Sequence, residues 1–160
     1  MEKKVLSVLV QNHAGVLARV ASLFCQRGFN IDSLTVSATN NPAISRITIV
    51  AMGDEQSFEQ IIKQTGKLVE CKAIYILDPQ ESLLRELLLV KVCVNPSNLT
   101  ILRETAGIYK AKIIDLSVDS MVMELTGEPN KIDGFLEILS QYEIIEMCRT
   151  GITALARGNK

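Results

Sequence analysis

Apolar and polar residues recur along the first half of the chain with two periods, that of a strand and that of a helix. The first apolar run has apolar residues on both faces, which is typical of a central strand. The following helix places its apolar side chains on one face and ends near Gly28. A hairpin, a second helix with Asp54 as its candidate N-cap, and a last strand complete the half. The predicted strands are residues 5–10, 31–38, 44–52 and 68–77, and the predicted helices begin at Val16 and after Asp54.

The second half of the chain repeats this order more loosely. Residues 31–36 and 114–118 are similar in sequence, and each half places a glycine and an acidic residue ahead of its second helix. The pattern therefore predicts an α+β fold of two ferredoxin-like βαββαβ units, each an antiparallel sheet with both helices on one face. The second set of predicted strands is 87–94, 113–118, 121–126 and 144–147, with helices beginning near Leu99 and after Gly127.

A polar break at Asp78–Ser82 separates the two halves. Such a break is where a domain boundary is expected, because few contacts cross it. The sequence predicts a first domain at 1–78, a linker at 79–84 and a second domain at 85–160.

The candidate chemistry lies in the turn between the first strand and the first helix, Gln11–Gly15. Backbone N–H groups at the start of a helix lack intrahelical acceptors, and the helix dipole favours an anion there. The N–H groups of Ala14, Gly15, Val16 and Leu17 are therefore the expected donors to a carboxylate. Asn12 adds a side-chain donor and an acceptor. The corresponding turn of the second half, Asn95–Leu99, contains no glycine, so a pocket is expected only in the first unit.

Other residues could extend this turn into a pocket for an amino acid. Asn30 and the backbone of Ile31, if a second copy of the chain brings them close, could hold an ammonium group, and Val16, Leu17 and Ile31 could form an apolar wall. From these residues alone a purely structural role for Gly15 remains the simpler interpretation, because Asn-x-x-Gly is common before a helix.

Composition and charge argue against several classes of partner. The chain has 17 basic and 18 acidic residues and a net charge of −1, so it has no field that attracts nucleic acid or an anionic membrane. Aromatic residues make up 4% of the chain and Trp is absent, which disfavours an RNA-binding sheet of the same topology. No positioned nucleophile or base favours a small phosphatase. Without a signal peptide or a spanning apolar run, a cytoplasmic location is expected.

Cysteine and histidine spacing predicts no metal site. The four cysteines form no C-x-x-C pair and the chain has one histidine, His13. The cysteines are expected to be reduced and buried as small apolar groups. His13 is expected to face solvent, and Arg19, Arg27 and Arg46 are expected to be solvated surface residues.

Two segments of the first half, Asn12–Leu17 and Gln26–Val36, resemble the ACT domain of acetolactate synthase small subunits. The resemblance covers nearly the whole chain. It continues through Ile44–Ile49, Glu59–Gln64, Lys67–Glu70, Ile113–Asp115, Leu125–Gly127, Lys131–Phe135 and Arg149–Ile152.

The resemblance implies a noncatalytic regulatory subunit that activates a separate large catalytic subunit in branched-chain amino-acid biosynthesis and confers valine feedback inhibition on it. It also implies a homodimer through the ACT domains, with valine at the interface. The implied valine contacts are Asn12, His13, Ala14, Gly15, Val16 and Leu17 from one chain and Asn30 and Ile31 from the other.

Thiamine diphosphate, flavin and magnesium would belong to the catalytic partner, so no cofactor, metal or catalytic residue is expected in this chain. His13-Ala14 departs from the family pattern within the turn. The alternative is a stand-alone ACT-domain amino-acid sensor that controls another partner.

Overall fold

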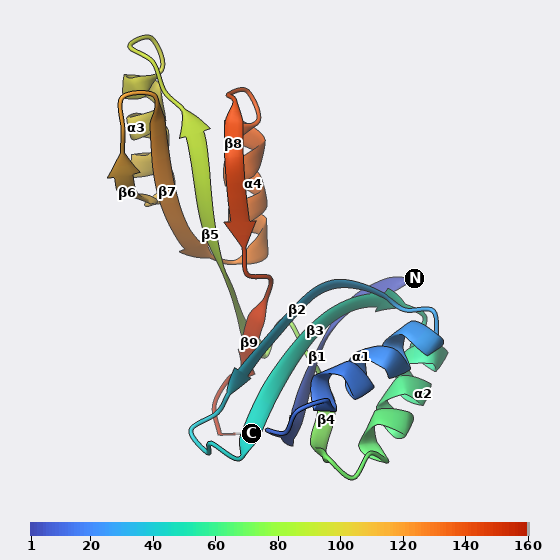
Figure 1. Ribbon diagram of the computed structural model, residues 1–160. Helices are drawn as coiled ribbons and strands as arrows, with labels where there is room; N and C mark the ends of the chain where they lie inside the picture. The colour runs from blue at the N-terminus through green and yellow to red at the C-terminus, as the bar shows by residue number, and fades with distance from the viewer. Residues whose placement is uncertain (160) are drawn as a thin grey trace. The chain divides into compact units, whose positions relative to one another are not determined.

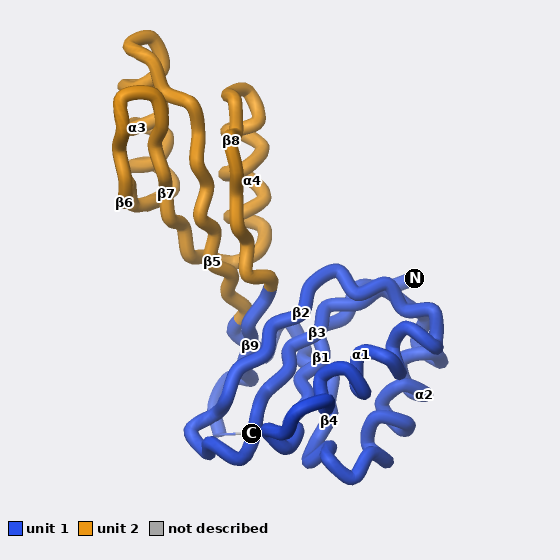
Figure 2. Tube along the Cα trace, in the orientation of Figure 1, with its two compact units in different colours: residues 1–83, 152–160 blue, residues 84–151 orange. Residues whose placement is uncertain are grey.

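The computed structural model describes residues 1–159, and these residues form two compact units (Figure 1). The first unit is Met1–Leu83 together with the segment from Ile152 onward, and the second is Leu84–Gly151 (Figure 2). Each unit is an antiparallel sheet with two helices, so the predicted α+β fold of two βαββαβ units is confirmed.

The first unit has the predicted element order, and its four-stranded sheet runs β2-β3-β1-β4. All neighbouring strands are antiparallel, and β1 is an interior strand, as its two apolar faces predict. The elements are β1 (Glu2–Gln11), α1 (Val16–Gln26), β2 (Asn30–Ala38), β3 (Ile44–Gly53), α2 (Glu55–Gly66) and β4 (Cys71–Leu77).

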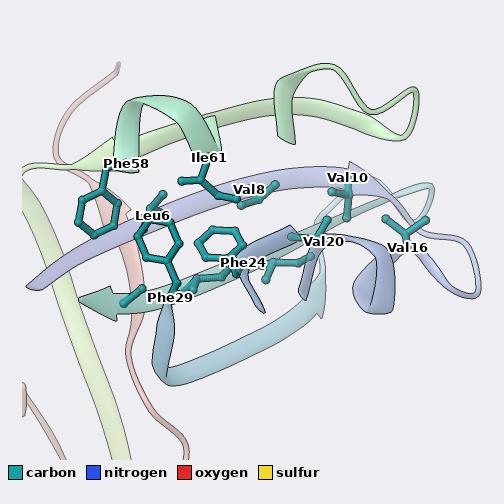
Figure 3. Packing of buried hydrophobic residues seen from close by; sticks show 12 residues of the cluster. Leu6, Val8, Val10, Val16, Val20, Phe24, Phe29, Phe58 and Ile61 are labelled. Carbon is teal, nitrogen blue, oxygen red and sulfur yellow. The ribbon is translucent and has the colours of Figure 1, made fainter. Parts of the chain in front are cut away.

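The core of the first unit lies between this sheet and the two helices (Figure 3). Three aromatic rings form its centre: Phe29 lies 5.5 Å from Phe24 and 5.1 Å from Phe58, measured between ring centroids. Tilted rings at this separation pack favourably. Alternate residues of β1 point into the core beside them, namely Leu6, Val8 and Val10.

Local signals in the sequence define both helices of the first unit. Gly28 follows α1 with φ +75°, a left-handed conformation that stops a helix at low cost. Asp54 is the N-cap of α2, and its Oδ1 accepts a 2.7 Å hydrogen bond from the Ser57 N–H. This backbone hydrogen bond lowers the pKa of Asp54 because it favours the ionised carboxylate.

The sheet face that points away from the helices is also buried. Val5 of β1 and Val50 of β3 alternate with core residues, so their side chains lie on this face, yet both are buried. Ile152 and Ala154, from the end of the chain, are 7% and 4% exposed, and the Ile152 carbonyl accepts a 3.0 Å hydrogen bond from Thr35 Oγ1. The returning segment therefore covers part of the helix-free face.

This segment contains β9 (Thr153–Ala156), a strand that the sequence analysis did not predict. It pairs with β5 (Ser82–Cys93), and Arg157 N–H donates a 2.7 Å hydrogen bond to the Glu81 carbonyl. The sequence predicted a second domain of residues 85–160. In the structure, residues 152–159 of this range pack with the first unit instead. The physical reason is that Ile152 and Ala154 bury their side chains there.

The second unit repeats the arrangement with sheet order β6-β7-β5-β8. Its core places Leu88, Val90 and Val92 of β5 against Phe135 of α4 and Leu102 of α3. No helix among residues 1–159 is long and apolar enough to cross a membrane. The elements are β5 (Ser82–Cys93), which begins within the first unit, α3 (Leu99–Tyr109), β6 (Lys112–Leu116), β7 (Ser120–Gly127), α4 (Pro129–Leu139) and β8 (Ile144–Arg149).

The four cysteines are free thiols, but the prediction that they are buried is wrong. Cys25 and Cys148 are exposed, and Cys71 and Cys93 are partly exposed. In α1 the core-facing positions are taken by Val20 and Phe24, which leaves the next residue, Cys25, on the solvent side.

Candidate functional site

The candidate site is the turn that joins β1 to α1, and Asn12 fixes its shape. The Asn12 backbone N–H donates a 2.8 Å hydrogen bond to the Ala43 carbonyl, and its side-chain Nδ2 donates a 3.0 Å hydrogen bond to the Pro42 carbonyl. These bonds tie the turn to the loop that precedes β3. Asn12 therefore uses its donors for structure and keeps its Oδ1 as an acceptor.

Gly15 is the N-cap of α1 and adopts φ +85°, a conformation that other L-residues rarely adopt. No side chain caps the helix at this end. The Gly15 carbonyl accepts the first helical hydrogen bond, 3.1 Å from the Arg19 N–H. Gly15 has a structural role here, and its lack of a side chain also leaves the helix end open.

The open helix end presents several backbone donors. The Val16 N–H is already used, in a long 3.4 Å hydrogen bond to the His13 carbonyl. Within the described part of the chain, four N–H groups of this turn have no acceptor, and they lie at the positive end of the helix dipole, where a carboxylate would be stabilised. These are the N–H groups of Ala14, Gly15, Leu17 and Ala18.

This set differs from the predicted donors at two positions. Val16 was expected to contribute its N–H and an apolar wall, but its side chain is 5% exposed and packs in the core. Leu17 is 38% exposed and can contact a ligand. The Ala18 N–H was missed because no sequence signal distinguishes it from the other N–H groups of the first turn. His13 is exposed, as predicted, and so is Ala14.

Arg19, Arg27 and Arg46 were expected to be solvated surface residues, and each makes side-chain hydrogen bonds. Arg19 and Arg27 are exposed, as expected, whereas Arg46 is partly buried. Arg19, near the turn, forms an ion pair with Glu70, so its charge is already balanced. Arg27 joins α1 to α2 through a 3.0 Å hydrogen bond to the Gln64 side chain and a 3.2 Å hydrogen bond to Gln60. The charge of Arg19 is thus balanced by Glu70, and Arg27 is held between the two helices through its Nε and Nη1.

Asn30 and Ile31 lie at the opposite end of the same sheet. Asn30 pairs with Met52, which in turn pairs with Lys3 at the start of β1. The candidate turn follows Gln11 at the other end of β1. A single copy of the chain therefore does not bring Asn30 and Ile31 to the turn. Among residues 1–159 no group of His, Cys, Asp and Glu side chains is placed to hold a metal ion.

Two protein-family models match the chain. Residues 6–71 match the ACT domain of the AHAS small subunit type, and residues 85–158 match the small subunit of acetolactate synthase. A probable acetolactate synthase small subunit of Archaeoglobus fulgidus is 45% identical over 158 residues, which is 99% of each chain. The acetolactate synthase small subunit of Haemophilus influenzae is 40% identical over 99% of this chain and 98% of its own length.

A solved structure agrees with these sequence matches. The acetolactate synthase small subunit of Thermotoga maritima is 38% identical, aligns over 100% of both chains and superimposes with a TM-score of 0.91.

The fold and the family match define an ACT-domain protein with a second ferredoxin-like domain. More specifically, the chain belongs to the acetolactate synthase small-subunit family, as the resemblance in its motifs implies.

Proposed function

We propose that this chain docks to a separate acetolactate synthase catalytic subunit, raises its activity without itself catalysing the reaction, and makes the complex sensitive to valine. The names of the relatives support a large-subunit partner, because a small subunit implies a large one. The observation that carries the effector site is the open N-terminus of α1, where four backbone donors meet beside Gly15.

The chemistry of valine fits the groups at this turn. Its carboxylate accepts from the free N–H groups of Gly15 and Leu17, and the helix dipole adds to the attraction. Asn12 Oδ1 accepts from the ammonium group. The exposed Leu17 side chain packs against the isopropyl group. A small aliphatic zwitterion uses each of these features.

The strand register supports a site completed by a second copy. β2 is an edge strand, and its Ala38 end lies beside the turn, because Ala38 pairs with Ser45 and Ser45 pairs with Val10. Asn30 lies at the other end of β2, roughly 26 Å away at about 3.3 Å per residue. Antiparallel pairing of two β2 edges about a two-fold axis sets the partner's Asn30 beside Ala38. The two halves of the proposed valine site then meet across the interface.

Regulation follows if the two halves of the site separate or rotate between an active and a less active arrangement. Valine contacts both copies, so it binds more tightly to the arrangement in which the halves meet. By linkage it shifts the population toward that arrangement.

The decisive experiment measures acetolactate formation by the matched catalytic subunit, with and without this chain, across a valine titration. We expect the chain to raise the rate and valine to reverse the increase. Gly15→Asp places a carboxylate at the ligand's own carboxylate and should weaken valine inhibition by roughly tenfold or more.

Gly15→Asn is the matched control for this substitution. Asn and Asp are similar in size and both tolerate the left-handed conformation that Gly15 adopts at φ +85°, so the two variants differ mainly in charge. Full valine sensitivity of Gly15→Asp would overturn the site. If valine binds by calorimetry but the chain never activates the catalytic subunit, the function is that of a stand-alone sensor with another partner.

A further inference from the structure

Arg46 occupies an unusual position on the helix-free face of the first unit. It lies on β3 between the inward-facing Ser45 and Ile47, so its side chain points away from the helices. Its Nη1 donates to Ser7 Oγ and, at 3.0 Å, to Tyr75 Oη. Both acceptors are neutral hydroxyls: Ser7 belongs to the adjacent strand β1, and Tyr75 belongs to β4, which lies beyond β1 in the sheet. The guanidinium is therefore held in place without a balancing charge.

The positive charge of Arg46 has no carboxylate within ion-pair distance in the part of the chain that the structure describes. This contrasts with Arg19, which forms an ion pair with Glu70. Arg46 is also partly buried, and a cation removed from water is stabilised by an anion. Nε and Nη2 donate to no described residue, and together they form a planar fork that matches a carboxylate.

Arg46 lines a cavity of about 410 Å³ on this face. Ser37, Asn40 and Thr153 contribute side chains whose polar atoms bond to no described residue. Leu9 and Leu155 contribute apolar walls. Arg46 is the single charged residue of the described lining, so an ammonium group would find no carboxylate there. The lining thus gives a carboxylate with a short apolar tail a charged partner and gives an ammonium group only neutral oxygens.

We propose that this cavity binds a small aliphatic carboxylate that lacks an ammonium group, with the carboxylate on the Arg46 fork and the tail against Leu9 and Leu155. This inference goes beyond the proposed function, because the site lies on the helix-free face and does not use the turn of Gly15. It gives the first unit two binding sites, one for an amino acid and one for an organic anion.

Occupancy of the site has a consequence for the returning segment. Thr153 belongs to β9, whereas Arg46 belongs to the sheet. A ligand that contacts both adds an interaction between the segment and the sheet. It therefore stabilises the packed form of the segment and raises the protection of its backbone N–H groups against hydrogen exchange.

The test uses calorimetry on the full chain with two probes of the same carbon skeleton: valine, and the 2-oxo acid that carries oxygen in place of its ammonium group. The 2-oxo acid should bind the unaltered chain and lose roughly tenfold or more in affinity in Arg46→Gln, because a charge-assisted fork is removed. The same substitution should leave valine affinity unchanged.

Arg103→Gln is the matched control, because Arg103 lines a cavity of the second unit and its loss removes the same charge elsewhere. This variant should bind the 2-oxo acid as the unaltered chain does.

Tyr75 provides a second readout that does not depend on the fold of Arg46→Gln. Burial alone would raise the pKa of Tyr75, but the hydrogen bonds from Arg46 and Ser7 outweigh it and lower the pKa. A bound anion neutralises Arg46 and should raise the Tyr75 pKa, seen as a phenolate absorbance change that is lost in Tyr75→Phe.

Three results would overturn the proposal: no binding of the 2-oxo acid, equal affinity in the unaltered chain and Arg46→Gln, or an equal loss of affinity in Arg103→Gln. Valine binding without 2-oxo acid binding would overturn this inference and leave the proposed function standing.

Discussion

The two units have the same topology, but they treat the turn between the first strand and the first helix in opposite ways. In the first unit Gly15 leaves the helix end open. In the second unit the Asn95 Oδ1 accepts hydrogen bonds from the N–H groups of Ser97 and Asn98, at 2.9 and 3.0 Å, and Asn98 Oδ1 accepts from the Asn95 N–H at 2.8 Å. The N–H groups of Thr100 and Ile101, in the first turn of α3, lack acceptors among the described residues, as those of Leu17 and Ala18 do in α1. The difference between the units therefore lies in the turn before the helix, whose N–H groups are satisfied by Asn95 in the second unit and have no acceptor at Ala14 and Gly15 in the first.

A second contrast concerns partly buried arginines. Arg149 in the second unit is held by Glu86 through two of its nitrogen atoms and by Asp133 at 2.8 Å. Arg46 in the first unit has hydroxyl partners in place of carboxylates. In both contrasts the second unit satisfies its polar groups internally, and the first unit keeps donors available. The proposed ligand sites of the first unit require such available donors.

The largest expected effect tests whether the units are energetically separate. Phe24→Ala and Phe135→Ala each remove a fully buried ring, from the first and second core respectively, and should lower the free energy of unfolding of that unit by about 3–5 kcal/mol. Hydrogen exchange resolved by residue should show the loss in the mutated unit. Uniform loss across both units from either variant would mean that they unfold as one.

Removal of the returning segment should have the next largest effect. A chain that ends before Ile152 exposes the part of the helix-free face that the segment covers, and the lost burial of Ile152 alone corresponds to about 1.5–3 kcal/mol. The matched control variant replaces 84–151 by a flexible linker and keeps the segment. Thermal unfolding of the first unit should occur at a higher temperature in the linker variant, and equal midpoints would show that the segment adds no stability.

A smaller effect is expected from a substitution of Arg149 in the second unit. Arg149→Met leaves the Glu86 carboxylate, 6% exposed, without its cation, and should cost about 2–3 kcal/mol at pH 7 after allowance for the partial exposure of Arg149. An isolated buried carboxylate has a raised pKa, so its penalty is present above that pKa and fades as the pH falls and the group is protonated. Urea unfolding at neutral and acidic pH measures this.

The double variant Glu86→Gln with Arg149→Met serves as the control. It should recover part of the loss at neutral pH, since no buried charge remains. A loss that is the same at every pH and in the double variant would contradict the ion-pair account.

The smallest effect sharpens the contrast between the two turns. Asn95→Ala removes the acceptor that closes the second turn and should lower the free energy of unfolding by about 1 kcal/mol. It should not create a valine site, because the second turn lacks a residue equivalent to Gly15. Calorimetry with the Gly15→Asp, Asn95→Ala double variant would detect such a site, and any new valine binding would show that free N–H groups alone are sufficient.

Much of the fold could be predicted because its signals are local. The spacing of Val20 and Phe24 predicts α1, and Asp54 predicts the start of α2. The open turn was predicted from Gly15 for the same reason. β4 begins at Cys71, after the predicted Leu68, since Leu68 still accepts a turn hydrogen bond from Cys71.

The features that sequence could not predict depend on contacts between distant residues. β9 is four residues long and half of them are alanine, so its pattern is too weak to mark a strand, and its burial depends on a sheet far away in the sequence. Arg46 and Ser7 are 39 positions apart, and nothing in either segment indicates that they meet. Val16 shows the same limit, because its place in the core is set by packing against the sheet.

The return of the chain to its first unit also bears on biosynthesis. The ribosome makes Ile152 and Ala154, which are buried in the first unit, only after the whole second unit has been made. Until Ile152 and β9 leave the ribosome, the nascent first unit keeps an apolar sheet face in contact with water or with a chaperone. A premature stop shortly before Ile152 would therefore release a chain whose second unit is complete and whose first unit is prone to aggregate.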